Sequence, residues 1–549
     1  MKRFSATFFY FIFLLSSGHL WSQVKTRSST PKPKLVVGIV VDQMRNDYIY
    51  RYWDRFGNGG FKRLVNDGYY FKNAHYNYIP TYTGPGHCSI YTGATPRAHG
   101  IIGNDWYDKT SGKYMYCVED TSVKTVGASG KKGCMSPKNQ LSSTVGDELK
   151  MSTNGGAKVF ALALKDRSSV LPAGHAANAA FWFDDVSGNF ISSTWYVQNL
   201  PAWLELFNKK EMAKNYLSTG WQPLYAPYTY SNSIADDNRY EAALNKKEKA
   251  TFPYDYNSFL EKNNLGILRA TPFGNSITKD LAIACLQNEQ LGKDDIADLF
   301  CISFSSTDVI AHAYGPRAME VEDVYLRLDK DVEDLLNALD KEVGKDNYTV
   351  FLTADHGGAD VPNQLMDNKI PAGYVSEKKM VAALKNYFNQ TYGDTMILAS
   401  FSNEQVFLNQ KKLMDLKLDQ EQVEQKLSQF LITLPGIAEA YPSSVMKEQA
   451  FRWNDYRALL QNGYNHRLSG NVCFLYAPAW MDHAQKGTTH GAGYNYDTHV
   501  PIIFYGNGIK KGVSHKYTTI TQIAPTLCEL LKINQPNTAA AEPLNDFFK

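Results

Sequence analysis

Aspartate and histidine side chains recur in this chain at spacings that suit a metal centre. Asp308 and His312 are four residues apart, which places both on one face of a helical turn. Asp355 and His356 are adjacent and precede two glycines. Carboxylate and imidazole donors together suit Zn²⁺, and this set could hold two such ions. The six candidate metal ligands are Asp42, Asp308, His312, Asp355, His356 and His490.

Each of these residues has an ordinary structural alternative. An aspartate after a strand, such as Asp42, commonly caps a turn. Asp308 with His312 could be a polar pair on a helix surface, and His490 in its glycine-rich loop is uninformative alone. The joint pattern carries the prediction of a metal centre. Because the same donors also suit Mn²⁺ or iron, the residues leave the identity of the metal open.

A hydroxyl group is the second chemical feature of the sequence. Thr81 and Thr83 precede a Gly-Pro-Gly turn at residues 84–86, just ahead of an apolar run. This arrangement is typical of an ordinary helix start, but it would also suit a nucleophile held at the positive end of a helix. A free threonine hydroxyl is a weak nucleophile, so metal coordination or a neighbouring base would have to activate it.

The elements that would position these residues are buried strands. Near-continuous apolar runs that end in polar residues are typical of strands covered on both faces of a parallel sheet. They span residues 35–41, 158–164, 299–304, 348–352 and 500–505. Helical patterns at 277–291 and 319–343 alternate with them. The sequence therefore predicts an α/β fold with a doubly wound, mostly parallel sheet, whose ligands bind at the carboxyl ends of the strands.

Two segments interrupt this alternation. Residues from about 175 to 270 are aromatic and loop-rich, without a clear helix–strand repeat. Residues from about 370 to 475 contain helical patterns at 376–392 and 419–431 beside a strand-like run at 405–408. We expect both segments to be insertions, the second of them a small α+β subdomain.

The N-terminus predicts export. Lys2 and Arg3 precede about a dozen apolar residues and then small residues, as in a secretory signal peptide covering residues 1–22. No later segment approaches the length of a membrane span, so we expect a periplasmic or secreted mature protein without one. An uncleaved membrane anchor is the alternative.

Charge and cysteine content exclude some classes of function. The net charge is +2, and without Lys2 and Arg3 the 55 acidic residues are matched by as many basic ones. No nucleic-acid binding is therefore expected. The seven cysteines form no C-x-x-C pair, which argues against a zinc ribbon. Cys117 and Cys134 flank a loop that a disulfide could close, and the odd count leaves at least one thiol free.

Five short motifs resemble those of the alkaline phosphatase superfamily, in the same order along the chain. They are Thr83-Gly84-Pro85-Gly86-His87, Ser89-Ile90-Tyr91-Thr92-Gly93, His99-Gly100-Ile101-Ile102-Gly103-Asn104, Thr353-Ala354-Asp355-His356-Gly357 and His490-Gly491. The nearest branches are the nucleotide pyrophosphatase/phosphodiesterase-like enzymes and, closer still, the PafA-type alkaline phosphatases of bacterial periplasms. The resemblance runs from about residue 34 to 535 and implies one alkaline-phosphatase-like catalytic domain carrying the two insertions.

The resemblance implies two zinc ions and a threonine nucleophile. Asp308, His312 and His490 match the ligands of one zinc site, and Asp42, Asp355 and His356 match those of the other. Thr83 matches the nucleophile and would approach the second zinc through its oxygen. Physical reasoning agrees, because Pro85 suits the first helical turn and backbone N–H groups at a helix N-terminus favour anions. Thr81 would then support the turn.

The implied substrate is a small-molecule phosphate monoester. Asn104 matches a residue that donates a hydrogen bond to a phosphoryl oxygen, and Lys165 with Arg167 matches the Lys-x-Arg pair of the PafA-type monoesterases. A monoester dianion carries more charge than a diester monoanion, and a lysine with a bidentate arginine meets that need. The expected enzyme is an exported two-zinc alkaline phosphatase that forms a phosphothreonine.

Several alternatives stay open at this point. The nearest is a phosphodiesterase or nucleotide pyrophosphatase on the same scaffold, for which Lys165 and Arg167 would be a solvated pair. A sulfatase would resemble C-x-P-x-R where this chain has Thr83 and His87, so that chemistry is disfavoured. A phosphonate hydrolase and a metal-binding protein without catalysis are further possibilities. The remaining histidines are expected to pack or donate hydrogen bonds rather than bind metal: His87, His99, His483 and His499.

Overall fold

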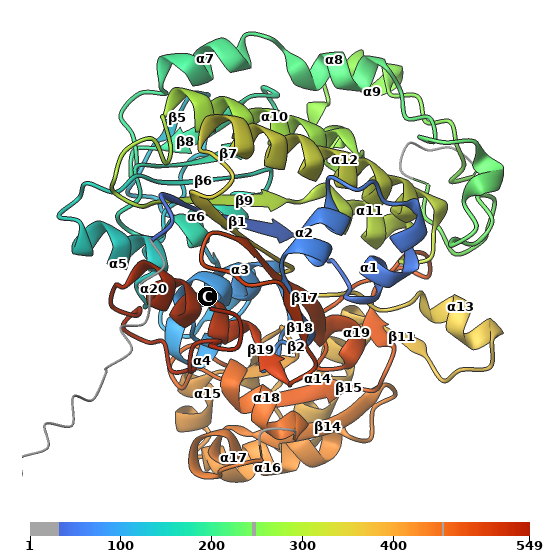
Figure 1. Ribbon diagram of the computed structural model, residues 1–549. Helices are drawn as coiled ribbons and strands as arrows, with labels where there is room; N and C mark the ends of the chain where they lie inside the picture. Colours follow the sequence, from blue (N-terminus) through green and yellow to red (C-terminus); the bar gives the residue numbers. More distant parts are fainter. Residues whose placement is uncertain (1–31, 244–248, 453–454, 549) are drawn as a thin grey trace, which may run out of the picture.

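The computed structural model describes residues 32–243, 249–452 and 455–548 (Figure 1). The predicted signal peptide at residues 1–22 lies outside the described residues. Within them, no helix combines the length and the apolar character needed to cross a membrane.

A central sheet of eleven strands organises the larger part of the molecule. Five neighbouring strands at its centre run parallel to one another. In spatial order they are β10 (Tyr348–Thr353), β1 (Leu35–Val41), β9 (Asp298–Phe304), β6 (Val159–Ala163) and β7 (Ala179–Phe183). Every residue of β1 and β9 is buried, which explains why their sequences are apolar without alternation.

Helices cover both faces of this sheet (Figure 1). Helices α10 (Phe273–Asn288) and α12 (Met319–Glu342) pack together on one face. On the other face lie α3 (Thr83–Thr92), α6 (Arg167–Ala173) and α20 (Ile523–Leu531), of which α6 and α20 both contact α3. The predicted doubly wound α/β fold is confirmed, and the predicted helices at 277–291 and 319–343 correspond to α10 and α12.

Further strands, some antiparallel and some parallel to their neighbours, extend the sheet at both edges. On one side β17 (His499–Gly506) pairs with β10 and with β2 (Tyr69–His75), and β18 (Gly512–Ser514) and β19 (Thr518–Thr519) add to β2. On the other side β8 (Phe190–Ser193) pairs with β7 and with β5 (Thr125–Val126). Strands β7 and β8 lie within the segment at 175–270 that the sequence suggested as an insertion.

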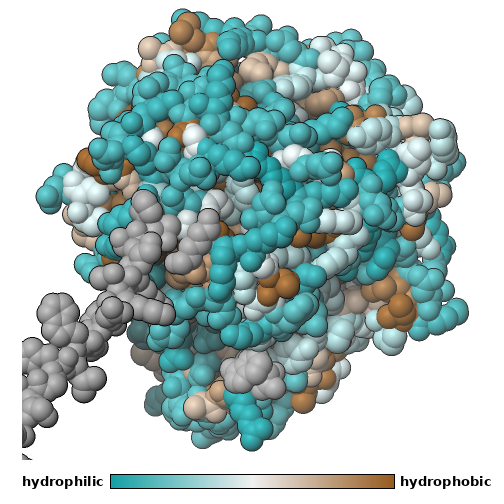
Figure 2. All heavy atoms as spheres, in the orientation of Figure 1, coloured by the Kyte–Doolittle hydropathy of each residue, from teal (hydrophilic) through white to brown (hydrophobic). Residues whose placement is uncertain are grey.

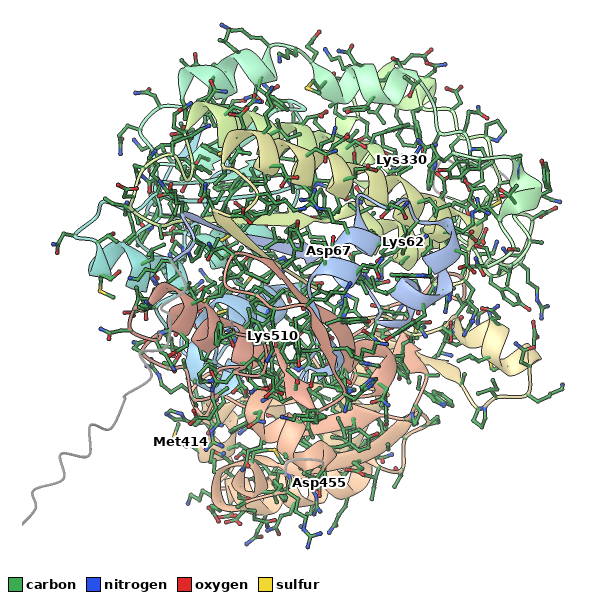
Figure 3. All side chains as sticks on the ribbon, in the orientation of Figure 1. Lys62, Asp67, Lys330, Met414, Asp455 and Lys510 are labelled. Carbon is green, nitrogen blue, oxygen red and sulfur yellow. The ribbon has the colours of Figure 1, made fainter. Side chains whose placement is uncertain are left out.

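A second, smaller sheet belongs to the inserted subdomain. Its strands lie in the order β12 (Leu398–Ser402), β13 (Gln405–Leu408), β15 (Val472–Tyr476) and β14 (Ile437–Pro442). Helices α14 (Glu377–Tyr392) and α16 (Gln420–Leu431) supply its apolar core together with these strands. Figure 3 marks this part by Met414 and Asp455, well below Lys330 on α12.

All seven cysteines are free thiols in the structure. Cys117 is buried and Cys134 partly buried, and the disulfide considered between them does not form.

Candidate active site

The candidate metal ligands gather at the carboxyl edge of the parallel strands. Asp42 follows β1 directly, and Asp355 with His356 follows β10. Asp308 lies in the first turn of α11 (Ser306–Tyr314), which begins just after β9, and His312 is one turn further along. Because β10, β1 and β9 are parallel neighbours, their carboxyl ends meet at one edge and bring these side chains together.

The six residues form two clusters of three. Asp42, Asp355 and His356 present ligand atoms that all lie within 4.8 Å of one another, and so do Asp308, His312 and His490. In the first cluster His356 Nε2 lies 3.5 Å from oxygens of both Asp42 and Asp355. The clusters adjoin, because the rings of His356 and His490 stack with centroids 3.4 Å apart.

All three imidazoles are oriented by backbone carbonyls. His312 Nδ1 lies 2.7 Å from the Thr488 carbonyl oxygen, His356 Nδ1 2.9 Å from that of Gly357, and His490 Nδ1 2.8 Å from that of Thr81. Each Nδ1 therefore donates its proton to the backbone, which leaves Nε2 free as an acceptor facing the cluster. This is the tautomer that a metal ion needs.

The charges of the clusters also fit divalent cations. Burial raises the pKa of Asp42, and the negative charges of Asp308 and Asp355 raise it further. Burial and the neighbouring His356 and His312 hold the pKa of His490 far below its usual value, so that ring is neutral. Buried oxygens Asp42 Oδ1 and Asp355 Oδ2 have no hydrogen-bond partner among the described residues. Clustered carboxylates with unpartnered oxygens, together with a neutral imidazole such as that of His490, are a donor set for divalent metal ions.

Thr83 begins α3 and faces the first cluster. The residue is 1% exposed, and its Oγ1 lies 3.4 Å from His356 Nε2. Gly86 lets α3 approach β10 this closely, because a Cβ there would lie 2.3 Å from the Asp355 carbonyl oxygen. The hydroxyl therefore stands at a helix N-terminus beside three candidate ligands, where an anion is favoured.

Three further side chains reach the same edge. Asn104 Oδ1 accepts a hydrogen bond of 2.8 Å from the Gly84 N–H, which leaves its Nδ2 donor group available. Lys165 Nζ lies 2.6 Å from Asp42 Oδ2 and 2.6 Å from Asp308 Oδ2, so it contacts both clusters. Arg167 donates to the Tyr116 hydroxyl at 3.1 Å, and its buried Nε has no partner among the described residues.

Lys165 stays charged in this setting. Burial alone would lower the pKa of its ammonium group, but the carboxylates of Asp308 and Asp42 raise it overall. The pKa of the Arg167 guanidinium is also raised: burial opposes its charge, and Tyr116 and Asp166 more than offset that effect. The candidate site thus carries two fixed positive charges next to two groups of carboxylates.

Sequence reasoning missed two residues that support the ligands. Gln43 donates from its backbone N–H to Asp355 Oδ1 at 3.1 Å and from Nε2 to Asp308 Oδ1 at 2.7 Å. Asp497 Oδ2 accepts from the N–H groups of Gly491 and Ala492 at 3.0 and 2.8 Å and so holds the loop that carries His490. The only sequence signal for Gln43 is its place next to Asp42, and Asp497 has none.

The other histidines lie outside the two clusters. His87 bonds the Thr83 carbonyl oxygen through Nδ1 and Ser303 Oγ through Nε2, each at 2.9 Å. His99 is fully buried and contacts Ser89, and burial lowers its pKa to about 3. His499 bonds the Lys72 carbonyl oxygen. His483 bonds the Ala484 carbonyl oxygen at 3.1 Å, and its ring lies parallel to that of His312 with centroids 6.2 Å apart.

Known proteins resemble this chain over nearly its whole length. The family model described as type I phosphodiesterase/nucleotide pyrophosphatase matches residues 36–492. Alkaline phosphatase PafA of Elizabethkingia meningoseptica is 43% identical over 538 residues, 97% of each chain. A protein named calcium-transporting ATPase, from Myroides odoratus, is 42% identical over 94% of each chain.

Solved structures show the same relationship. The crystal structure of wild-type alkaline phosphatase PafA superimposes with a TM-score of 0.92 at 41% identity, covering 95% of this chain and all of that one. A PafA variant substituted at one threonine, one asparagine, one lysine and one arginine superimposes with a TM-score of 0.91.

Proposed function

This chain belongs to the type I phosphodiesterase/nucleotide pyrophosphatase family and, within the alkaline phosphatase superfamily, lies with the PafA-type enzymes. On this premise we propose that it is an exported alkaline phosphatase that hydrolyses small-molecule phosphate monoesters through a phosphothreonine, with two zinc ions as cofactors. The position of Lys165 carries the proposal. Its ammonium group contacts Asp42 of one cluster and Asp308 of the other, and so places a positive charge beside Thr83 where a dianionic phosphoryl group must bind.

Each cluster would hold one zinc ion. Asp42, Asp355 and His356, with the Thr83 oxygen, would bind one, and Asp308, His312 and His490 the other. Two such ions supply charge stabilisation for the departing oxygen and lower the pKa of water to about 7.

The chain's own side chains would carry out the steps of the reaction. Thr83 Oγ1 attacks phosphorus in line, so that a Thr83–phosphorus bond forms as the bond to the alcohol breaks. Water then attacks the phosphothreonine and releases inorganic phosphate and free Thr83. Throughout, Asn104 Nδ2, Lys165 and Arg167 bind the phosphoryl oxygens, and the N–H groups at the start of α3 favour their negative charge.

The substitutions in the solved PafA variant support the choice of nucleophile and phosphate-binding residues. A threonine, an asparagine, a lysine and an arginine are altered in it together. The same four residue types stand here in the same order, as Thr83, Asn104, Lys165 and Arg167. The family description also names phosphodiesterases, which makes diester hydrolysis the rival that an experiment must separate.

Measuring kcat/KM of the zinc-loaded mature protein on an aryl phosphate monoester and on its matching diester separates the two. We expect the monoester to be strongly preferred. Lys165→Ala and Arg167→Ala should each lower monoester kcat/KM by about 10²–10³-fold and diester kcat/KM much less. Metal content is measured in each variant, because Lys165 contacts two candidate ligands. Lys158→Ala is the matched control, since Lys158 lies at the opposite end of β6 and its ammonium group bonds the backbone carbonyls of Glu289 and Gln290.

Acid-quenched enzyme gives the second readout. We expect phosphate on Thr83 by mass spectrometry, and no trapped phosphate in Thr83→Ala that still binds two metals. A preference for the diester, with little loss in the Lys165 and Arg167 variants, would replace the phosphatase with a phosphodiesterase. Turnover without a trapped phosphothreonine under any quench would remove the covalent step.

A further inference from the structure

A cavity opens directly beside the second metal cluster. It has a volume of about 260 Å³ and lies between the His490 loop and the inserted subdomain. His490 and Tyr82 line it, so a substrate whose phosphoryl group meets Thr83 would extend its alcohol portion into this space. The opposite wall comes from the turn at 401–404 and from β16 (Trp480–Asp482). The inserted subdomain therefore shapes the site where the leaving group would lie.

The charge of this cavity is negative. Besides Asp497, four carboxylates line it, and no lysine or arginine does. They are Asp105, Glu377, Glu404 and Asp482. Glu404 accepts hydrogen bonds of 3.2 and 3.3 Å from the Tyr82 hydroxyl, and no described basic side chain pairs with it. Burial raises the pKa of Glu404 to about 7, and the charge of Asp482 adds to the effect, as expected of carboxylates that face a common space.

Aromatic rings form the rest of the wall. Tyr82, Tyr476, Trp480 and Tyr494 all line the cavity. Trp480 is held tightly, because a Cβ at Gly436 would lie 2.4 Å from its ring and one at Gly373 would lie 2.8 Å away. Tyr494 is fixed by a 2.9 Å hydrogen bond to the Tyr476 carbonyl oxygen. These aromatic faces are therefore preorganised before a ligand arrives.

A buried carboxyl oxygen without a partner adds an independent sign of a ligand. Asp497 also lines the cavity and is fully buried, yet its Oδ1 has no hydrogen-bond partner among the described residues. Its other oxygen is fully used in holding the His490 loop. An unpartnered buried oxygen normally has a partner in the working molecule, such as water or a ligand donor.

Aromatic faces together with carboxylates form a binding site for organic cations, since the ring quadrupole and the negative charges both attract an ammonium group. We propose that this cavity holds the leaving group and selects alcohols that carry an ammonium group, so that phosphate monoesters of amino alcohols are preferred substrates. The inference rests on the proposed phosphatase function and names the substrate class of that site. Sugar phosphates are the rival class, because carboxylates and aromatic rings also bind polyols.

Phosphocholine and 3,3-dimethylbutyl phosphate give the sharpest test, because they share a shape and differ by one positive charge. We expect the wild-type enzyme to show a kcat/KM at least about 10-fold higher for phosphocholine, a cation–π and charge effect of order 1 kcal/mol or more. In Glu404→Gln and in Asp482→Asn the ratio should fall toward one. Asp415→Asn, an exposed carboxylate of the same subdomain outside the cavity, should keep the wild-type ratio.

The outcomes separate the two proposals. Equal kcat/KM for the charged and neutral esters would overturn the ammonium site and leave the phosphatase intact. A higher kcat/KM for glucose 6-phosphate than for phosphocholine would replace the ammonium site with a polyol site. Turnover of none of these esters by metal-loaded protein would overturn the phosphatase and the inference with it.

Discussion

Gln43 is hydrogen-bonded to both candidate metal clusters. Its backbone N–H bonds Asp355 of one cluster and its side-chain amide bonds Asp308 of the other. The residue has φ of 60°, a left-handed conformation that costs a non-glycine residue about 1–2 kcal/mol. Because the side chain is 1% exposed, the surrounding packing holds this strained backbone in place. In this backbone conformation the N–H of Gln43 donates to the candidate ligand Asp355, and its side-chain amide donates to the candidate ligand Asp308.

Replacing Gln43 with leucine should therefore weaken one metal site more than the other. The Leu variant loses the donor to Asp308 but keeps the backbone N–H that bonds Asp355. Loss of such an outer partner typically lowers metal affinity about 10–100-fold. Titrating zinc out of the protein with a competing chelator should show one ion leaving earlier than in the wild type. Unchanged affinity at both sites would mean that Asp308 needs no support from Gln43.

Among single residues, the sequence best predicted the functional ones whose residue type serves only a few structural or chemical roles in proteins. Asp355 and His356 after an apolar strand, or Thr83 before Gly-Pro-Gly, suggest chemistry by their types and neighbours. Gln43 could not be predicted, because its role comes from a backbone angle and from contacts with residues about 265 and 312 positions away. The cavity carboxylates are equally scattered along the chain and meet only in the fold.

At the scale of elements, the contact between α10 and α12 buries a carboxyl group that takes no part in the candidate active site. Asp331 on α12 is 6% exposed and accepts a 3.0 Å hydrogen bond from Ser276 on α10. Lys279 Nζ approaches only to 4.0 Å. Burial raises the pKa of Asp331 to about 7, and the partial compensation from Lys279 and Ser276 does not offset this.

Asp331→Asn should consequently stabilise the protein at alkaline pH. In the unfolded chain this carboxyl ionises near its usual value of 3.8, whereas in the fold it keeps its proton until about pH 7. The native state binds more protons between these values, so stability falls as pH rises from about 4 to 7 and the full cost persists above 7. That cost is at most about 4 kcal/mol.

The gain in Tm of Asp331→Asn over wild type should be larger at pH 8 than at pH 5. Asp415→Asn, at an exposed carboxylate away from this contact, should give little change at either pH. An equal gain for Asp331→Asn at both pH values would contradict the shift.

Elements with long, unambiguous patterns were predicted well. The helical pattern at 319–343 corresponds to α12 (Met319–Glu342), and the pattern at 419–431 corresponds to α16 (Gln420–Leu431). Strands β7 and β8 were missed because their aromatic residues stand in a segment without a clear helix–strand repeat in its sequence. Their pairing with β6 and β5 depends on partners distant in sequence, which no local pattern reveals.

For the whole molecule, the carboxyl ends of the central strands position candidate metal ligands, and the inserted subdomain lies below the central sheet in Figure 1. Its turn at 401–404 forms part of the cavity wall. The face shown in Figure 2 is largely hydrophilic, with apolar side chains in small scattered groups. The balanced charge of the sequence agrees with such a surface. Selectivity for a charged substrate must then come from the local site, where in the proposed reaction Lys165 and Arg167 would bind the phosphate and the carboxylates would face its leaving group.

Metal removal should lower the stability of the whole fold, and its effect should not be confined to the candidate site. Asp42, Asp308 and Asp355 follow three adjacent strands and are almost fully buried, so their negative charges repel one another at the edge where β10, β1 and β9 meet. Ions that bind only the folded state stabilise it, by about 2.7 kcal/mol for each site at 100 times its Kd. We expect a strong chelator to lower Tm by several degrees and added zinc to restore it. His490→Ala, which removes one ligand from one cluster, should lose only part of this shift. Chelation that abolishes activity while Tm stays constant would show that the metals serve the chemistry alone and do not contribute to the stability of the fold.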